Sequence, residues 1–116
     1  MTDWARPVVH WAITAVDIEA QCAFYGHLFS WDMAPGPFVP IAAGIGGPEP
    51  GPGGHFQGGA APGVSLYIQV RSLRETLDRA VELGGAITAE PFDLPGQPTL
   101  AGIKDPEGND IMLVQQ

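Results

Sequence analysis

Few side chains in this sequence could exchange protons in a binding site. His10 and Asp110 are the titratable residues that strand patterns place away from the predicted helices, and His55 is a third candidate. An imidazole titrates near neutral pH and can serve as a general acid or base. Asp110 follows a turn at the mouth of a strand, where a solvated surface carboxylate is the favoured interpretation. The catalytic residues, if any, are therefore unknown at this point.

Residues for other kinds of catalysis form no recognisable pattern. Cys22 is the single cysteine. No motif that lowers a thiol pKa surrounds it, so we expect a small buried core residue. The spacing supports no Ser-His-Asp or Cys-His arrangement. Glycines are dense between residues 34 and 63, but none follows a strand and opens a helix, so a phosphate-binding loop is not expected.

Aromatic side chains suggest binding rather than reaction. Trp31, Phe38, Phe56 and Tyr67 fall near the expected site. They could stack on a planar ligand or form ordinary core. Both interpretations remain open from the sequence.

Two strand–helix units must position these residues. Residues 8–14 alternate between apolar and more polar positions, which predicts a half-buried strand, and Asp17 can cap the helix that follows. Residues 64–70 repeat the strand pattern. A second helix is predicted to begin after Ser72 and to end at the glycine pair that starts with Gly84.

The two units are copies of one pattern. A shift of 55 residues without a gap places Val9 on Val64 and the cap Asp17 on the cap Ser72. Each copy is predicted as a βαβββ module. The sequence thus predicts one domain made of two related halves.

The predicted fold class is α+β, with a single domain over residues 1–116. Module one covers about 8–58 and module two about 64–115. Together they are expected to form a curved eight-stranded mixed sheet, with both helices on the outer face and a cleft on the other. Residues 43–63 are expected to be mostly loop.

The cleft is predicted from strand faces. His55 and Gln57 share a face if their segment is a strand, while Phe56 points the other way. The candidate cleft residues are His10, Thr14, Trp31, His55, Gln57, Ser65, Tyr67, Gln69, Asp110 and Met112.

Charge and composition exclude some partners. The formal net charge is -8, so the chain lacks the basic surface that a nucleic acid requires. The same charge would steer a basic ligand toward an acidic cleft. Residues 1–7 do not resemble a signal peptide, and no window is long and apolar enough to span a membrane. We expect a cytoplasmic protein with no membrane partner.

Four segments carry a resemblance to a known family: VHWAI at 9–13, FYGHLFSW at 24–31, VELGG at 81–85 and DPEGN at 105–109. They resemble the vicinal oxygen chelate superfamily, which contains glyoxalases, bleomycin-resistance proteins and extradiol dioxygenases. The resemblance covers nearly the whole chain and is specific for fold. It is far less specific for activity, because this scaffold hosts many enzymes and also metal-free drug-binding proteins. It further implies a homodimer.

The resemblance also implies positions for a divalent metal such as Ni, Zn, Mn or Fe. These positions fall on His10, Ser65, Met112 and Gln57, and His55 lies two residues before Gln57. Serine and methionine are poor ligands for such cations, and the set contains no carboxylate. No cofactor is therefore expected, and His10 and His55 are the candidate ligands if a metal does bind.

Two functions remain in competition. The first is a small-molecule-binding protein without the usual metal site, sequestering a drug-like or natural-product ligand. The alternative is a metal-dependent lyase, isomerase or dioxygenase of the glyoxalase type that uses His10 as a ligand. A metal-free enzyme with an organic cofactor or activated substrate is a third possibility, so whether the protein is an enzyme stays open.

Overall fold

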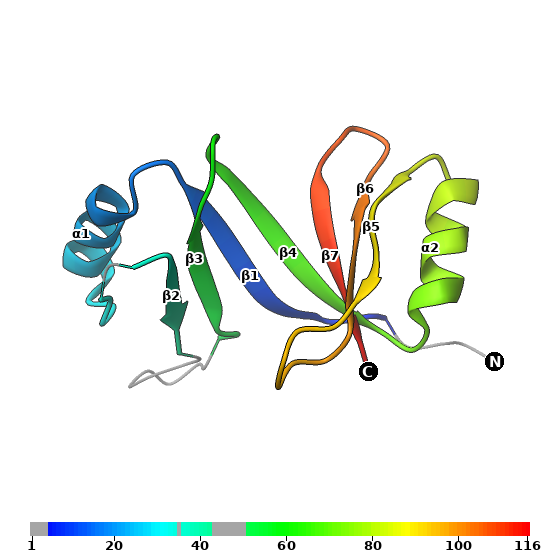
Figure 1. The fold of residues 1–116 in the computed structure, drawn as a ribbon, viewed down its shortest axis with the longest axis horizontal. Helices are drawn as coiled ribbons and strands as arrows, with labels where there is room; N and C mark the ends of the chain where they lie inside the picture. The colour runs from blue at the N-terminus through cyan, green and yellow to red at the C-terminus, as the bar shows by residue number, and fades with distance from the viewer. Residues whose placement is uncertain (1–4, 35, 43–50) are drawn as a thin grey trace. The chain divides into compact units, whose positions relative to one another are not determined.

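The computed structural model describes residues 5–34, 36–42 and 51–116. The fold is α+β, with seven strands and two helices in these residues (Figure 1). The chain divides into two compact units, residues 10–64 and residues 65–116 with 1–9, called here the N-terminal and C-terminal units. The elements are β1 (Val8–Ala15), α1 (Ile18–Phe29), β2 (Phe38–Ile41), β3 (Gly54–Gly58), β4 (Gly63–Val70), α2 (Leu73–Glu82), β5 (Ala86–Phe92), β6 (Leu100–Lys104) and β7 (Asp110–Gln115).

The N-terminal unit places its strands in the order β2-β3-β1. β1 runs parallel to β3, and β2 runs antiparallel to β3. Helix α1 lies alongside β2 and β3 (Figure 1). Its core contains the buried residues Cys22, Val39 and Phe56. One face of these strands therefore packs on the helix, and we call it the helix face.

Helix α1 begins and ends where local chemistry requires. The side chain of Asp17 accepts a hydrogen bond from the backbone N–H of Ala20 at 3.1 Å, as an N-cap should. Ser30 ends the helix in the left-handed region with φ of 59°. Ile18 and Tyr25 pack on the core beside Cys22, whereas Phe29 is 52% exposed. The spacing of Ile18, Cys22, Tyr25 and Phe29 in the sequence predicts one apolar stripe along this helix, and the prediction is correct except at the exposed Phe29.

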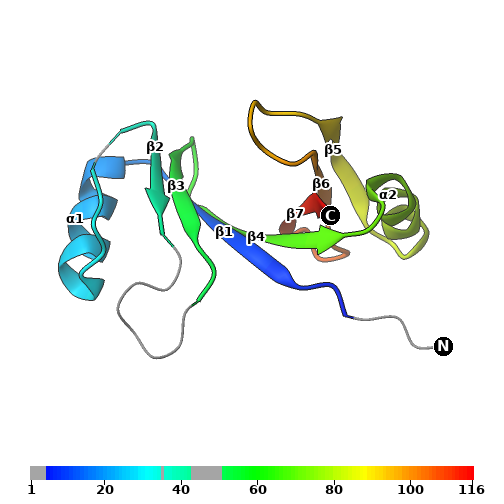
Figure 2. The ribbon, with the colours of Figure 1, turned by 90° about the horizontal axis from the view of Figure 1, so that it is seen from below.

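The C-terminal unit has the predicted order of one strand, one helix and three strands. Its strands lie in the order β4-β7-β6-β5, with β4 parallel to β7 and the other pairs antiparallel. Helix α2 lies beside β5 (Figure 2). The core is the buried cluster Val70, Leu73, Leu77, Ala101 and Leu113.

Helix α2 follows its sequence signals. The hydroxyl of Ser72 accepts from the N–H of Glu75 at 3.2 Å. At the other end Gly84 adopts φ of 99°, a conformation that side chains disfavour. Both ends of the helix therefore lie where the sequence predicts.

Two expectations about strands need correction. Eight strands were expected, but the described residues contain seven. The N-terminal unit has no strand between α1 and β2 in residues 30–34 and 36–37, a segment that contains Gly36 and Pro37 and is therefore poorly suited to a strand. The sequence predicts a strand at 86–88, and β5 extends beyond it to Phe92. It tolerates Pro91 because it is an edge strand, next to β6 in the strand order.

Part of the expected loop at 43–63 forms β3, and residues 43–50 of it lie outside the described residues. In the described part of the chain, neither helix is long and apolar enough to cross a membrane.

Candidate ligand-binding site

Four predicted site residues meet on the face of the N-terminal unit opposite its helix. His10 and Thr14 lie on β1, and His55 and Gln57 lie on β3. The parallel register pairs Ala12 with His55 and Thr14 with Gln57. Because side chains alternate along strands, His10, Thr14, His55 and Gln57 share one face, which we call the polar face.

The polar face contains a continuous chain of hydrogen bonds. Nε2 of His10 lies 2.8 Å from Nδ1 of His55. Nε2 of His55 lies 3.0 Å from Oε1 of Gln57, and Nε2 of Gln57 donates to the hydroxyl of Thr14 at 3.3 Å. Four side chains from two strands are therefore linked end to end.

Gln57 sets the direction of this chain. Its Oε1 atom can only accept, so Nε2 of His55 must carry the proton of that bond. A neutral imidazole has one N–H, so Nδ1 of His55 is the acceptor for Nε2–H of His10. The contacts thus fix one tautomer for each neutral histidine.

Burial makes this network costly to disturb. His55 is 5% exposed, and no other polar or charged residue that the structure describes is buried. No buried side-chain nitrogen or oxygen in the described segments lacks a hydrogen-bond partner. Burial, and secondarily the charge of His55 when protonated, lowers the pKa of His10. The His10 ring is therefore held toward its neutral form.

Phe38 extends the polar face onto β2. Its ring stacks on His55 with centroids 4.5 Å apart and planes 26° apart. The rings of His55 and His10 follow at 5.0 Å and 30°. Phe38 remains 57% exposed. Three rings therefore stand side by side across β2, β3 and β1, and the outermost ring is open to solvent.

Trp31, another predicted site residue, does not join this group. It packs on the helix-face core, stacked on Trp11 at 5.6 Å and on Tyr25 at 5.7 Å. Phe56 is buried in the same core with 0% exposure. These two aromatic residues are thus core, whereas Phe38 belongs to the polar face.

The other predicted site residues lie in the C-terminal unit. Ser65, Tyr67 and Gln69 lie on β4, and the register pairs Tyr67 with Met112 of β7. Burial raises the pKa of Tyr67. Asp110 forms an exposed ion pair with Lys104 at 3.0 Å. The solvated interpretation of Asp110 therefore agrees with its surroundings.

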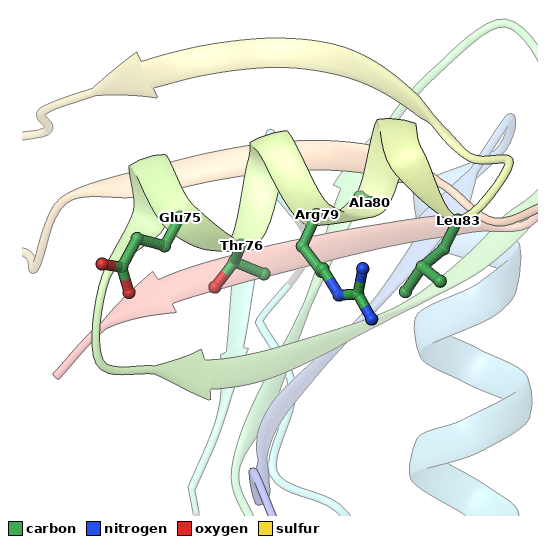
Figure 3. A pocket seen from close by; sticks show the side chains of 5 residues that line it. All are labelled: Glu75, Thr76, Arg79, Ala80 and Leu83. Atoms are coloured by element: carbon green, nitrogen blue, oxygen red, sulfur yellow. The ribbon is translucent and has the colours of Figure 1, made fainter.

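Open grooves lie elsewhere on each unit. One of about 420 Å³ runs along α2 and is lined by Glu75, Thr76, Arg79, Ala80 and Leu83 (Figure 3). Another of about 670 Å³ lies where α1 begins, beside Gly36 and Gly58. Neither groove is lined by a residue that the sequence predicted for the site.

The polar face does not fit the divalent metal that the fold implies. Because Nε2 of His55 donates to Gln57, the hydrogen bond between the two histidines uses a proton on Nε2 of His10. A metal held by both histidines needs a lone pair from each of these facing nitrogens, so it would have to displace that proton. Among residues 5–34, 36–42 and 51–116, no three His, Cys, Asp or Glu side chains are grouped to hold an ion. The donor set also lacks a carboxylate, so we derive no chemistry through a metal.

Sequence reasoning missed two features of the site. One is the link from Gln57 to Thr14, which depends on a strand register that the intervening loop hides. The other feature is the charge of the N-terminal unit, which could have been read from the sequence: residues 10–64 contain four Asp or Glu and no Lys or Arg. The unit that carries the polar face is therefore uniformly acidic.

Comparison with known proteins identifies the family. Residues 10–114 match the glyoxalase-like domain family. The chain belongs to this family, and through it to the glyoxalase, bleomycin-resistance and dioxygenase superfamily. No curated protein sequence matches the chain.

Solved structures share the fold at low sequence identity. A glyoxalase/bleomycin resistance protein/dioxygenase superfamily member from Vibrio splendidus is 15% identical with a TM-score of 0.67, covering 97% of this chain and 100% of that chain. Methylmalonyl-CoA epimerase from Mycobacterium tuberculosis is 14% identical with a TM-score of 0.61, covering 93% and 86%. An extradiol ring-cleaving dioxygenase from B. fuscum is 14% identical with a TM-score of 0.63, covering 94% and 32%. These similarities show the fold and no particular activity.

Proposed function

We propose that this protein binds a small organic molecule on the polar face of its N-terminal unit without a metal ion. The observation that carries the proposal is the directed hydrogen-bond chain from His10 through His55 and Gln57 to Thr14. A buried polar network is a poor source of stability compared with an apolar core. Its value lies in holding donors and acceptors in fixed positions, as a binding site requires.

The ligand class follows from charge and from Phe38. The N-terminal unit has acidic residues and no Lys or Arg, which favours a cation. The exposed ring of Phe38 ends the row of stacked rings and favours a planar group beside it. A planar organic cation, such as a drug-like or natural-product molecule held in sequestration, combines both properties.

The alternative is a metal-dependent lyase, isomerase or dioxygenase with His10 as a ligand. The observation in its favour is that two imidazole nitrogens, Nε2 of His10 and Nδ1 of His55, already converge. A metal would have to displace the proton between them and change the tautomer of His10. The solved neighbours include an epimerase and a dioxygenase, so the scaffold itself permits either function.

The test is calorimetric titration of chelator-treated protein with proflavine, a planar aromatic cation. Fluorescein, a planar anion, and spermidine, a flexible cation, are the controls. We expect saturable binding of proflavine only, and loss of that binding in His55→Leu protein that remains folded. Absence of proflavine binding, or equal binding to folded His55→Leu protein, would overturn the proposal.

Homodimerisation and a cytoplasmic location stay predictions. Subunits of a dimer could supply further walls to the site, as the family resemblance implies. Sedimentation of the protein with and without proflavine measures both the oligomeric state and its dependence on ligand.

A further inference from the structure

The indole of Trp11 lies directly over Gly54. Trp11 follows His10 on β1 and points to the helix face, where the register pairs it with Gly54 of β3. A Cβ atom at Gly54 would come within 2.1 Å of Cδ2 of the indole, so no other residue fits there without displacement. Nε1 of Trp11 also donates to the carbonyl oxygen of Pro52 at 3.2 Å. Trp11 thus holds the chain just before His55 at two points.

Strand β3 needs such a restraint because it is short and flanked by glycines. The segment reads Gly53-Gly54-His55-Phe56-Gln57-Gly58-Gly59. Glycine-rich strands specify their register weakly. A shift by one residue is opposed by alternation, since it would turn the buried Phe56 toward the polar face. A shift by two residues keeps every side chain on its own face, so alternation does not prevent it.

Trp11 excludes the two-residue shifts. Either shift would place Pro52 or Phe56 under the indole in place of Gly54, and both carry side chains that the contact cannot admit. After either shift, His55 would no longer lie beside its hydrogen-bond partner His10. The contact therefore selects the one register in which Nδ1 of His55 meets Nε2 of His10.

We propose that Trp11 is the positioning residue that sets His55 against His10. It acts from the helix face on a hydrogen bond of the polar face, through Gly54 and Pro52. The bearing of this on ligand binding rests on the proposed function, but the positioning does not. Its test therefore needs no ligand.

The experiment measures the histidine rings by long-range 1H–15N correlation in labelled protein, including the coupling across the His10–His55 hydrogen bond. Trp11→Leu removes the restraint. Trp31→Leu is the matched control, because Trp31 stacks on Trp11 in the same cluster, whereas the three atoms nearest to a Cβ at Gly54 all belong to Trp11. We expect Trp11→Leu to lose the coupling and the fixed His55 tautomer, and Trp31→Leu to keep both.

Gly54→Ala is the second variant and decides the question if Trp11→Leu does not fold. It leaves Trp11 intact but forces the indole and β3 apart, so the same coupling should be lost in folded protein. Retention of the coupling in folded Trp11→Leu or Gly54→Ala protein would overturn the proposal. Equal loss in Trp31→Leu would also overturn it, because cluster packing alone would then explain the effect.

Discussion

Nε2 of His55 donates to Oε1 of Gln57 at 3.0 Å, and this contact orients the whole polar face. Gln57→Leu removes the acceptor of this N–H on the buried His55 ring. We expect the free energy of unfolding to fall by about 1–3 kcal/mol, as measured by urea denaturation. Thr14→Val is the control, since it removes only the last acceptor of the chain and should cost less. Equal costs for the two variants would contradict the assigned direction.

The lowered pKa of His10 predicts a stability change in acid. Burial, followed by the charge of His55, lowers its pKa in the folded protein from the ordinary value of 6.5. As pH falls below 6.5, the unfolded chain binds a proton that the folded protein still refuses, so stability decreases. Stability then levels off below the folded pKa. His10→Gln should show a shallower fall in melting temperature between neutral pH and about pH 5. Parallel curves for the two proteins would contradict this account.

Gln115 stabilises the start of helix α2. Its Oε1 accepts from the N–H of Leu73 at 3.2 Å, and its Nε2 donates to the carbonyl oxygen of Arg71. Gln115→Ala should lower the free energy of unfolding by about 1–3 kcal/mol. Gln116→Ala is the matched control, because the Gln116 side chain is exposed and only its backbone N–H bonds Val70. Comparable denaturation curves for both variants would show that the side chain of Gln115 contributes nothing.

Phe38 should contribute to ligand affinity. Loss of one stacked ring costs about 0.5–1.5 kcal/mol, so Phe38→Ala should weaken proflavine binding by about twofold to twelvefold. Phe24→Ala is matched in chemistry and exposure, since Phe24 is 58% exposed on α1 and Phe38 is 57% exposed. Calorimetry should find unchanged binding in Phe24→Ala. A larger effect at Phe24 would place the ligand on the helix instead.

Local patterns predicted the elements well. The caps at Asp17 and Ser72 and the stop at Gly84 each act within a few residues, so their chemistry is visible in the sequence. The alternation of β1 correctly separated His10 from Trp11. From the sequence we expected a strand between α1 and β2, although Gly36 and Pro37 in that segment argue against one.

The candidate site was predictable only in part. His55 and Gln57 share a face because they are two residues apart, and that inference is correct. Their distance to His10 and Thr14 depends on pairing between β1 and β3, which are separated by a helix and a loop. Trp31 lies in the helix-face core and not on the polar face. Its direction could not be read from the sequence because it follows the left-handed Ser30, and irregular backbone has no period.

Metal content, measured together with ligand binding, tests the central claim most directly. Protein purified without a tag or chelator is analysed for elements, then titrated with proflavine before and after dialysis against EDTA. We predict no stoichiometric metal and the same proflavine affinity in both titrations. About one Ni, Zn, Mn or Fe per chain that is absent from His10→Ala protein, with proflavine binding lost in EDTA, would contradict the account and establish a metal site on the polar face.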